Sequence, residues 1–357
     1  MSRTILITAG GTGGHVFPGL AVADAMRAAG WRVVWLGAKT GMEARIVPAH
    51  GYEMAWVRAA ALRGKGLLAA VLLPLNLLVG FWQSARAILA HRPDVVLGLG
   101  GYVAFPGGMM ASLLARPLAV HEQNAIAGLT NRILAGVADR VMVAFPGTLK
   151  NAEWTGNPVR ADIAGIPAPD ERFANRNGPL RVLVVGGSLG AQALNDAVPK
   201  ALAQLPAHER PQVVHQSGEK HLESLRASYA AAGVEGELVP FIDDMARRYA
   251  ESDVVICRAG AITVAELSSA GMASVLVPFP HAVDDHQTAN AAFLAGRGAA
   301  VLMPQRELSP ERLASLVRSM DRATLLEMAR KARALGKPEA ANVVARRCIQ
   351  LAQMGIA

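Results

Sequence analysis

Thr4-Ile-Leu-Ile-Thr8 leads into Gly10-Gly-Thr-Gly-Gly-His15, and Arg181-Val-Leu-Val-Val185 leads into Gly186-Gly-Ser-Leu-Gly190. In each case an apolar strand runs into a glycine-rich turn, and a helical segment follows. Such a turn lets the backbone come close to an anion, while the next helix presents unpaired N–H groups and the positive end of its dipole. Two such turns, each opening one half of the chain, predict two Rossmann-like α/β domains facing one cleft.

The chain has the length and composition of a two-domain protein. Its 357 residues exceed one ordinary core, and 52% of them are hydrophobic against 18% charged. This supplies enough apolar material for two buried parallel sheets. The two cysteines, Cys257 and Cys348, lack metal-ligand spacing, which favours a reducing compartment. No signal peptide precedes the first strand, so we expect a cytoplasmic protein.

The net charge of +8 is distributed unevenly. Residues 1–160 carry 15 Lys and Arg against 7 Asp and Glu, whereas residues 161–357 carry 21 of each kind. This asymmetry indicates that only the first half faces an anionic surface or substrate. The sequence has no concentrated Lys/Arg tract interleaved with aromatic residues, so we expect no nucleic acid, and anionic lipid fits better.

An uncharged stretch, residues 66–85, lies between Lys65 and Arg86. It is long enough to span a bilayer, but a span would separate the first glycine turn from later parts of the same α/β core. Two interpretations remain: a wholly buried helix broken near Pro74 and Asn76, or a helical hairpin or interfacial helix that inserts into lipid. The flanking basic residues suit anionic headgroups. The predicted membrane contacts are Leu72, Leu75, Phe81 and Trp82.

Strand and helix alternate along both halves, which is typical of doubly wound parallel sheets. We predict strands at 4–8, 32–36, 94–97, 118–121 and 140–144, and then at 181–185, 212–216, 237–240, 254–257, 274–277 and 300–303. Helices are expected at 19–29, 128–136, 309–320, 322–335 and 340–352. The predicted domains are 1–160 and 161–338, joined by a hinge over 156–179. A C-terminal helix within 339–357 is expected to pack back on the first domain.

Neither glycine turn has the fingerprint of a dinucleotide-binding dehydrogenase. Gly-x-Gly-x-x-Gly is absent, and the second strand ends in Trp35-Leu-Gly-Ala-Lys39, where an acidic residue would hold the ribose. The sequence has no P-loop either. The turns therefore suit nucleotide diphosphates and sugars better than NAD or the transferred phosphate of ATP.

Seven motifs together carry a resemblance to a known family. They are Gly10-Gly-Thr-Gly-Gly-His15, Leu62-Arg-Gly-Lys-Gly66, Gly100-Gly-Tyr-Val103, His121-Glu-Gln-Asn124, Gly156-Asn-Pro-Val-Arg160, Gly186-Gly-Ser-Leu-Gly-Ala191 and Cys257-Arg-Ala-Gly-Ala-Ile-Thr-Val-Ala-Glu266. In this order they resemble the MurG family, the lipid II-forming N-acetylglucosaminyltransferases of glycosyltransferase family 28. The resemblance runs from the first strand to the last helix and implies the GT-B fold with no cofactor.

The same resemblance implies the reaction and the partners. It implies an inverting transfer of GlcNAc from UDP-GlcNAc to lipid I, the undecaprenyl-diphosphate-linked N-acetylmuramoyl pentapeptide, in peptidoglycan biosynthesis. It also implies an anionic membrane surface and other cell-wall synthesis proteins as partners. The protein is then expected to be peripheral, on the cytoplasmic face of the inner membrane.

Individual residue roles follow from the resemblance. The implied UDP-GlcNAc contacts are Thr12, Gly13, Gly14, Asn124, Arg160, Ser188, Ile242, Ala261, Ile262, Thr263, Val264, Ala265, Glu266, Gln287 and Asn290. Within this set, Ser188 is expected at the diphosphate and Glu266 at the ribose, with Gln287 and Asn290 at the GlcNAc hydroxyls. The acceptor diphosphate is expected at Gly10, Gly11, Gly100, Gly101 and Tyr102.

An inverting transfer needs a base for the acceptor hydroxyl, and His15 is the leading candidate because an imidazole titrates near neutrality. The alternative is that His15 caps the helix or binds a sugar oxygen. Asp243-Asp244 is interpreted as a solvated helix start and not as a metal site. His121 and Glu122 either have a structural role, in packing or loop hydrogen bonds, or a functional one, and neither is placed among the catalytic residues.

Three other functions stay open at this point. One is a GT-B transferase with a different lipid acceptor, such as a diacylglycerol glycosyltransferase. Another is a UDP-GlcNAc 2-epimerase, against which the basic, apolar first half argues. The third is a non-catalytic nucleotide-sugar-binding subunit.

Overall fold

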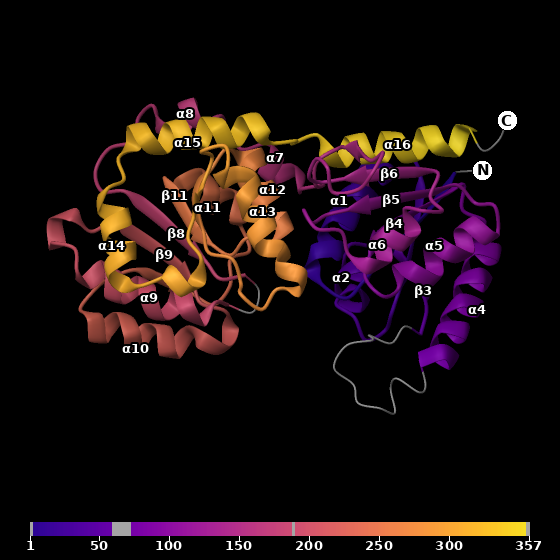
Figure 1. The fold of residues 1–357 in the computed structure, drawn as a ribbon, viewed down its shortest axis with the longest axis horizontal. Coiled ribbons are helices and arrows are strands. Elements are labelled where there is room, and N and C mark those ends of the chain that lie inside the picture. The colour runs from indigo at the N-terminus through magenta and orange to yellow at the C-terminus, as the bar shows by residue number, and fades with distance from the viewer. Residues whose placement is uncertain (1–2, 59–72, 188–189, 355–357) are drawn as a thin grey trace. The chain divides into compact units, whose positions relative to one another are not determined.

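Two units, each built around one parallel sheet, make up the protein in a computed structural model that describes residues 3–58, 73–187 and 190–354 (Figure 1). The first unit contains Met1–Arg160 and Glu339–Ala357, and the second contains Ala161–Pro338. Every strand pairing in both sheets is parallel. The predicted pair of doubly wound α/β domains is therefore confirmed among the described residues.

The sheet of unit 1 has the order β3-β2-β1-β4-β5-β6-β7. Its strands are β1 Thr4–Ala9, β2 Arg32–Gly37, β3 Glu53–Trp56, β4 Val95–Gly100, β5 Leu118–Glu122, β6 Arg140–Val143 and β7 Glu153–Trp154. The central strands β1, β4 and β5 are buried along their whole length, as strands covered on both faces must be. Sequence reasoning missed β3 and β7, which are short edge strands with exposed residues.

Helices cover both faces of this sheet. They are α1 Gly13–Ala28, α2 Glu43–Ala49, α4 Leu73–His91, α5 Ala104–Leu113, α6 Leu129–Leu134 and α16 Ala340–Met354. The helix α1 begins at Gly13, not at the predicted 19, and continues through Pro18. A proline there removes one helical hydrogen bond, to the carbonyl of Gly14, which is why the sequence suggested a later start.

The C-terminal helix α16 belongs to unit 1. Val344, Cys348 and Leu351 are buried in the same core as Val16 and Met26 of α1. On the outer side, Arg347 forms a two-bond ion pair with Glu153, with N···O distances of 2.6 and 2.8 Å. The last helix of the chain thus completes the core of the first unit.

The second unit repeats the design with the strand order β10-β9-β8-β11-β12-β13. Its strands are β8 Arg181–Val185, β9 Gln212–Gln216, β10 Glu237–Val239, β11 Val254–Cys257, β12 Ala273–Leu276 and β13 Val301–Leu302. Its helices are α7 Ala161–Ala164, α8 Pro169–Phe173, α9 Gln192–Ala203, α10 Leu222–Ala232, α11 Met245–Glu251, α12 Ala261–Ala270, α13 His286–Ala295, α14 Pro310–Arg318 and α15 Arg322–Leu335. All six predicted strands are present, with ends shifted by a residue or less.

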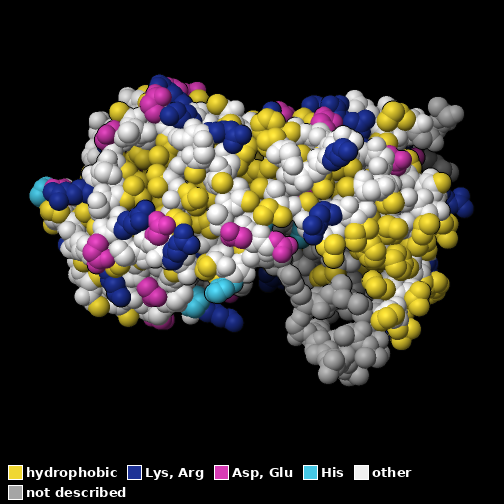
Figure 2. Space-filling view, in the orientation of Figure 1, with side chains coloured by type: hydrophobic (Ala, Val, Ile, Leu, Met, Phe, Trp, Pro, Cys, Tyr) yellow, Lys and Arg dark blue, Asp and Glu magenta, His cyan; other side chains and the backbone are white. Residues whose placement is uncertain are grey.

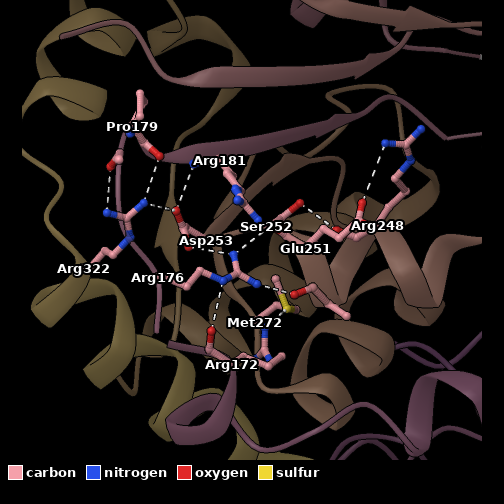
Figure 3. Close-up of polar contacts among 12 residues, drawn as sticks. Arg172, Arg176, Pro179, Arg181, Arg248, Glu251, Ser252, Asp253, Met272 and Arg322 are labelled. Atoms are coloured by element: carbon pink, nitrogen blue, oxygen red, sulfur yellow. Dashed lines mark hydrogen bonds and ion pairs between the residues drawn. The ribbon is translucent and has the colours of Figure 1, made fainter. Parts of the chain in front are cut away.

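The predicted hinge over 156–179 needs a correction, because its second part is fixed on unit 2. Arg172 is buried and donates to the carbonyl of Ala270 at the end of α12, 3.0 Å away. Arg176 and Arg322 both pair with the fully buried carboxylate of Asp253, at 2.8 and 3.2 Å (Figure 3). A charged group buried in this way is held firmly by its partners. Residues 168–179 are therefore an anchored part of unit 2.

Candidate active site

The first glycine turn connects β1 to α1. Gly11 has a φ of +94°, a conformation that favours glycine. Thr12 is the N-cap residue, so the unpaired N–H groups of the helix start are at the turn. His15 lies in the first turn of α1 and is half-buried, with Nδ1 3.4 Å from the hydroxyl of Thr12. The tautomer decides which ring nitrogen can accept a proton.

The second glycine turn of unit 1 lies directly against the first. β4 ends at Gly100, and a Cβ on Gly101 would lie 2.2 Å from the carbonyl oxygen of Gly10. A Cβ on Gly100 would lie 3.1 Å from Nε2 of His15. The structure therefore brings together the predicted base and the residues predicted for the acceptor diphosphate, namely Gly10, Gly11, Gly100, Gly101 and Tyr102. β1 and β4 are neighbours where the strand order reverses, which is where doubly wound sheets bind ligands.

Asn124 lies in a loop organised by the buried carboxylate of Glu122. That carboxylate accepts hydrogen bonds from the backbone N–H groups of Asn124 and Gly128, at 2.8 and 3.1 Å, and from Nδ2 of Asn131 at 2.9 Å. His121 is fully buried with Nε2 2.8 Å from the carbonyl of Gly156, and burial lowers the pKa of its imidazole to about 4. Both side chains are thus buried and form loop hydrogen bonds, which supports the structural interpretation of this pair.

The second unit carries its glycine turn after β8. Gly187 and Gly190 have φ values of +87° and +77°, and Ser188 lies outside the described residues. The side-chain amide of Gln216, at the end of β9, donates to the carbonyls of Gly187 and Pro240 at 3.0 and 3.1 Å. Gln216 thus ties the turn to the loop that carries Ile242, which is buried.

The predicted helix start at residues 261–266 is confirmed. α12 begins at Ala261 after the N-cap residue Gly260, which contributes no side-chain cap. Its first N–H groups, in Ala261, Ile262 and Thr263, have no acceptor within the helix, as at every helix start, and their contact with the donor phosphates stays a prediction. Val264 and Ala265 are buried. Glu266, in the second turn of α12, accepts a hydrogen bond from the hydroxyl of Tyr249 at 3.1 Å.

Gln287 and Asn290 of α13 both form hydrogen bonds with the backbone of Ala259, two residues before α12 begins. Oε1 of Gln287 accepts from the backbone N–H of Ala259 at 3.2 Å, and Nδ2 of Asn290 donates to the carbonyl of Ala259 at 3.2 Å. Asn290 is fully buried, and its contact with a sugar hydroxyl stays a prediction. In this structure, Asn290 supports the strand-to-helix connection on which the predicted donor contacts depend.

Other predicted residues are placed as follows. Arg160 is exposed at the end of unit 1. Asp244 caps α11 by accepting from the backbone N–H of Arg247 at 3.0 Å, so its interpretation as a helix start is confirmed. Gly13 and Gly14 form the first residues of α1.

The helix α4 presents an apolar face to the outside of unit 1. Leu75, Leu78 and Trp82 are 60%, 66% and 62% exposed, and Figure 2 shows hydrophobic side chains gathered over the region of α4 and α5. Phe81 is instead half-buried, with its ring 5.7 Å from that of Phe105 in an edge-to-face arrangement. The membrane contact of Phe81 stays a prediction, as do those of Leu75 and Trp82.

The described part of α4 is continuous from Leu73 to His91 and passes through Pro74 and Asn76, near which a break was expected. The predicted contact Leu72 and the earlier part of the apolar stretch lie outside the described residues. Among the helices that the structure describes, none combines the length and apolarity needed to cross a bilayer.

Comparison with known proteins identifies the family. Residues 5–143 match the glycosyltransferase family 28 N-terminal domain, and residues 181–344 match the glycosyltransferase family 28 C-terminal domain. The chain belongs to glycosyltransferase family 28. It is 68% identical to a protein of Aromatoleum aromaticum and 66% identical to one of Azoarcus sp., over 98% of this chain and 98% and 99% of theirs. Both are named UDP-N-acetylglucosamine--N-acetylmuramyl-(pentapeptide) pyrophosphoryl-undecaprenol N-acetylglucosamine transferase.

A solved family 28 structure has the same fold. The crystal structure of Acinetobacter baumannii MurG is 42% identical in sequence, covers 98% of this chain and 99% of that one, and superposes with a TM-score of 0.85. The two units therefore have the GT-B fold, and the sequence-based resemblance to this family is confirmed.

Sequence reasoning missed two residues that hydrogen-bond to the glycine turns, Glu43 and Gln216. Gln216 is the last residue of β9 and precedes Ser217-Gly218, and polar residues at the carboxyl end of a parallel strand are a recognisable signal. Glu43 gave no such signal, because an acidic residue at the start of a helix usually lies in solvent. In the structure its carboxylate is fully buried beside Gly11.

Proposed function

We propose that this family 28 enzyme transfers GlcNAc from UDP-GlcNAc to the C4 hydroxyl of lipid I and so forms lipid II for peptidoglycan synthesis. The observation that carries the proposal is the near-full-length identity, 68% over 98% of both chains, to a relative named for that reaction. The glycine turns of the two units and the uncapped start of α12 also support the proposal. They offer backbone N–H groups of the kind that bind diphosphates, and both substrates carry a diphosphate.

The chemistry is one displacement. The muramoyl C4 hydroxyl attacks the anomeric carbon of GlcNAc, the bond to the UDP oxygen breaks, and the hydroxyl proton passes to a base. His15 is the proposed base, because it lies where the two turns of unit 1 meet and an imidazole accepts protons near neutral pH. The leaving diphosphate gains negative charge, which N–H groups at a helix start stabilise.

Each unit is assigned one substrate in this proposal. The donor binds unit 2, with its diphosphate at the Gly186–Gly190 turn and the start of α12, and its ribose at Glu266. Tyr249 supports the last assignment, because its hydroxyl holds one oxygen of the Glu266 carboxylate and so fixes its direction. The acceptor binds unit 1, where the basic excess of the chain is found.

We further propose that the protein associates peripherally with the cytoplasmic leaflet through the exposed face of α4. Trp82 lies beside Arg86, whose guanidinium carbon is 5.9 Å from the indole centroid. An apolar surface next to basic side chains binds anionic lipid through both burial and charge. Such an association would keep the polyprenyl tail of the acceptor in the bilayer while its sugar enters the enzyme.

The transfer assay tests the reaction directly. The purified chain is incubated with radiolabelled UDP-GlcNAc and a short-chain lipid I analogue, with labelled UDP-glucose in parallel, and the lipid product is extracted. We expect label to enter the lipid fraction from UDP-GlcNAc only. Transfer from UDP-glucose at the same rate, or no transfer while UDP still binds, would contradict the proposed donor or acceptor.

A further inference from the structure

Glu43, the first residue of α2, is a fully buried acid beneath the first glycine turn. One carboxylate oxygen accepts a hydrogen bond from the backbone N–H of Gly11 at 3.1 Å, and the other accepts from Ala38 at 3.0 Å. None of the ion pairs among the described residues involves Glu43. A buried carboxylate held only by backbone donors is costly to bury, so its presence calls for a specific role.

The surrounding backbone is shaped to hold this side chain. A Cβ on Gly10 would lie 2.5 Å from Oε1 of Glu43, and a Cβ on Gly37 would lie 2.8 Å from its Cγ. A Cβ on Gly41 would lie 2.1 Å from Oε2. Three glycines from three segments thus leave room for one carboxylate, which shows that the carboxylate is an integral part of the turn.

The carboxylate also lies close to the second glycine turn. The phenol of Tyr102 has its pKa raised, first by burial and then by the negative charge of Glu43. The Tyr102 ring borders the first turn, because a Cβ on Gly11 would lie 3.3 Å from its Cε1. Glu43 thus holds the first turn, the carbonyl of Gly10 in that turn lies against Gly101 of the second, and His15 lies against the second turn at Gly100.

We propose that Glu43 is a positioning residue of the acceptor side: its carboxylate holds the first glycine turn against the second and so fixes the place of the His15 imidazole. This inference rests on the proposed function, in which His15 is the base. Because the N–H of Gly11 already donates to Glu43, the acceptor diphosphate binds to backbone N–H groups of the second turn and of the start of α5 instead.

Two substitutions separate the charge of the Glu43 carboxylate from the reach of its side chain. Glu43→Gln keeps the length of the side chain but offers one acceptor oxygen, so its NH2 group faces a backbone donor and one N–H loses its partner. Glu43→Asp keeps the charge and shortens the reach. The matched control is Asp94→Asn. Asp94 also accepts from a backbone N–H, that of Thr4 at 2.7 Å, but at the opposite end of β1.

The test combines kinetics with histidine NMR. With UDP-GlcNAc and a lipid I analogue, we expect both Glu43 variants to lower kcat by about 10- to 100-fold, because small misplacements of a catalytic group cost this much. The Kd for UDP should stay within about twofold, since the residues assigned to the UDP diphosphate and ribose lie in unit 2. In protein labelled at histidine, the His15 imidazole signal, identified by its loss in His15→Gln, should shift in the Glu43 variants and stay in place in Asp94→Asn.

Each outcome decides the proposal. An unchanged His15 signal with unchanged kcat overturns it, as does a loss of kcat no larger than in Asp94→Asn. If both Glu43 variants lose cooperative unfolding, Glu43 is a stability residue and the positioning role is also overturned. If the wild-type chain transfers no sugar, the proposed function fails on its own, and the NMR signal still decides whether Glu43 positions His15.

Discussion

The histidines of the protein differ in what surrounds the imidazole. His15 is half-buried at the meeting point of two glycine turns, beside the hydroxyl of Thr12. His121 is fully buried between Gln123 and the carbonyl of Gly156, and His215 is fully buried between Asn195 and Tyr229. Burial lowers the pKa of His121 to about 4 and that of His215 to about 3. They stay neutral and structural at neutral pH, whereas His15 has the exposure that proton transfer requires.

Replacing His15 tests its role as the base. His15→Ala should lower kcat by about 10²- to 10⁴-fold, the usual contribution of a general base, and should leave the Kd for UDP unchanged because the residues assigned to the UDP diphosphate and ribose lie in unit 2. Steady-state kinetics and calorimetric UDP binding measure the two effects. The control is His50→Ala, an exposed histidine at the end of α2. Wild-type turnover in His15→Ala would remove His15 from the mechanism.

The buried His121 predicts how stability depends on pH. The unfolded chain takes up a proton at His121 as pH falls past about 6.5, but the folded chain does so only near pH 4. The stability that depends on a neutral His121 is therefore fully present above pH 6.5 and is lost as pH falls from 6.5 to 4. Between pH 7 and pH 5 this loss amounts to about 2 kcal/mol.

Urea unfolding of the wild type and of His121→Asn at pH 7 and pH 5 measures this contribution. His121→Asn should be less stable at pH 7 but should lose less stability on acidification. His50→Asn, as the exposed control, should follow the wild type. Equal pH dependence in His121→Asn and the wild type would show that His121 is not the group responsible.

At the scale of elements, α4 shows how one helix divides its apolar residues between the core and the outside. Phe81 packs on Phe105 of α5, Ile88 is fully buried, and Leu75, Leu78 and Trp82 remain exposed. A surface of this kind on a protein usually marks an interaction site. The sequence showed an apolar stretch without a clear face, so it could not separate Phe81 from Trp82.

This division gives a matched pair of substitutions. Trp82→Ser should weaken binding to anionic vesicles by about tenfold and leave the Tm unchanged, because the indole is exposed. Phe81→Ser should instead lower the free energy of unfolding by about 1–3 kcal/mol, since it removes a packed ring. Vesicle sedimentation and thermal unfolding measure the two. Full vesicle binding by Trp82→Ser would argue against α4 as the lipid surface.

The strands and turns were predictable because they depend on local patterns. Continuous apolar runs before Gly10 and Gly186 marked the central strands, and the glycines there do have positive φ values nearby, at Gly11 and Gly187. The hinge was predicted too long, because its prolines suggested a linker while Arg176 binds Asp253, far away in the sequence. Glu43 and Gln216 escaped prediction for the same reason. Their roles come from the tertiary contacts that bury them.

At the scale of the whole molecule, the two units share one design and differ in surface. Both place a glycine turn at the point where the strand order reverses, after β1 in one and β8 in the other. The excess of basic residues and the exposed apolar face of α4 both belong to the first unit. This asymmetry supports a lipid-linked acceptor on the first unit and a soluble nucleotide donor on the second.

The linkage in the product tests the central claim most directly. The chain is incubated with UDP-GlcNAc carrying a 13C-labelled sugar and with a lipid I analogue, and the purified product is examined by NMR. A single displacement on the α-linked donor predicts a β-linked GlcNAc on C4 of the muramoyl residue, with the large anomeric coupling of a β-glucoside. An α-linkage, attachment at another hydroxyl, or labelled free GlcNAc as the only product would contradict the account.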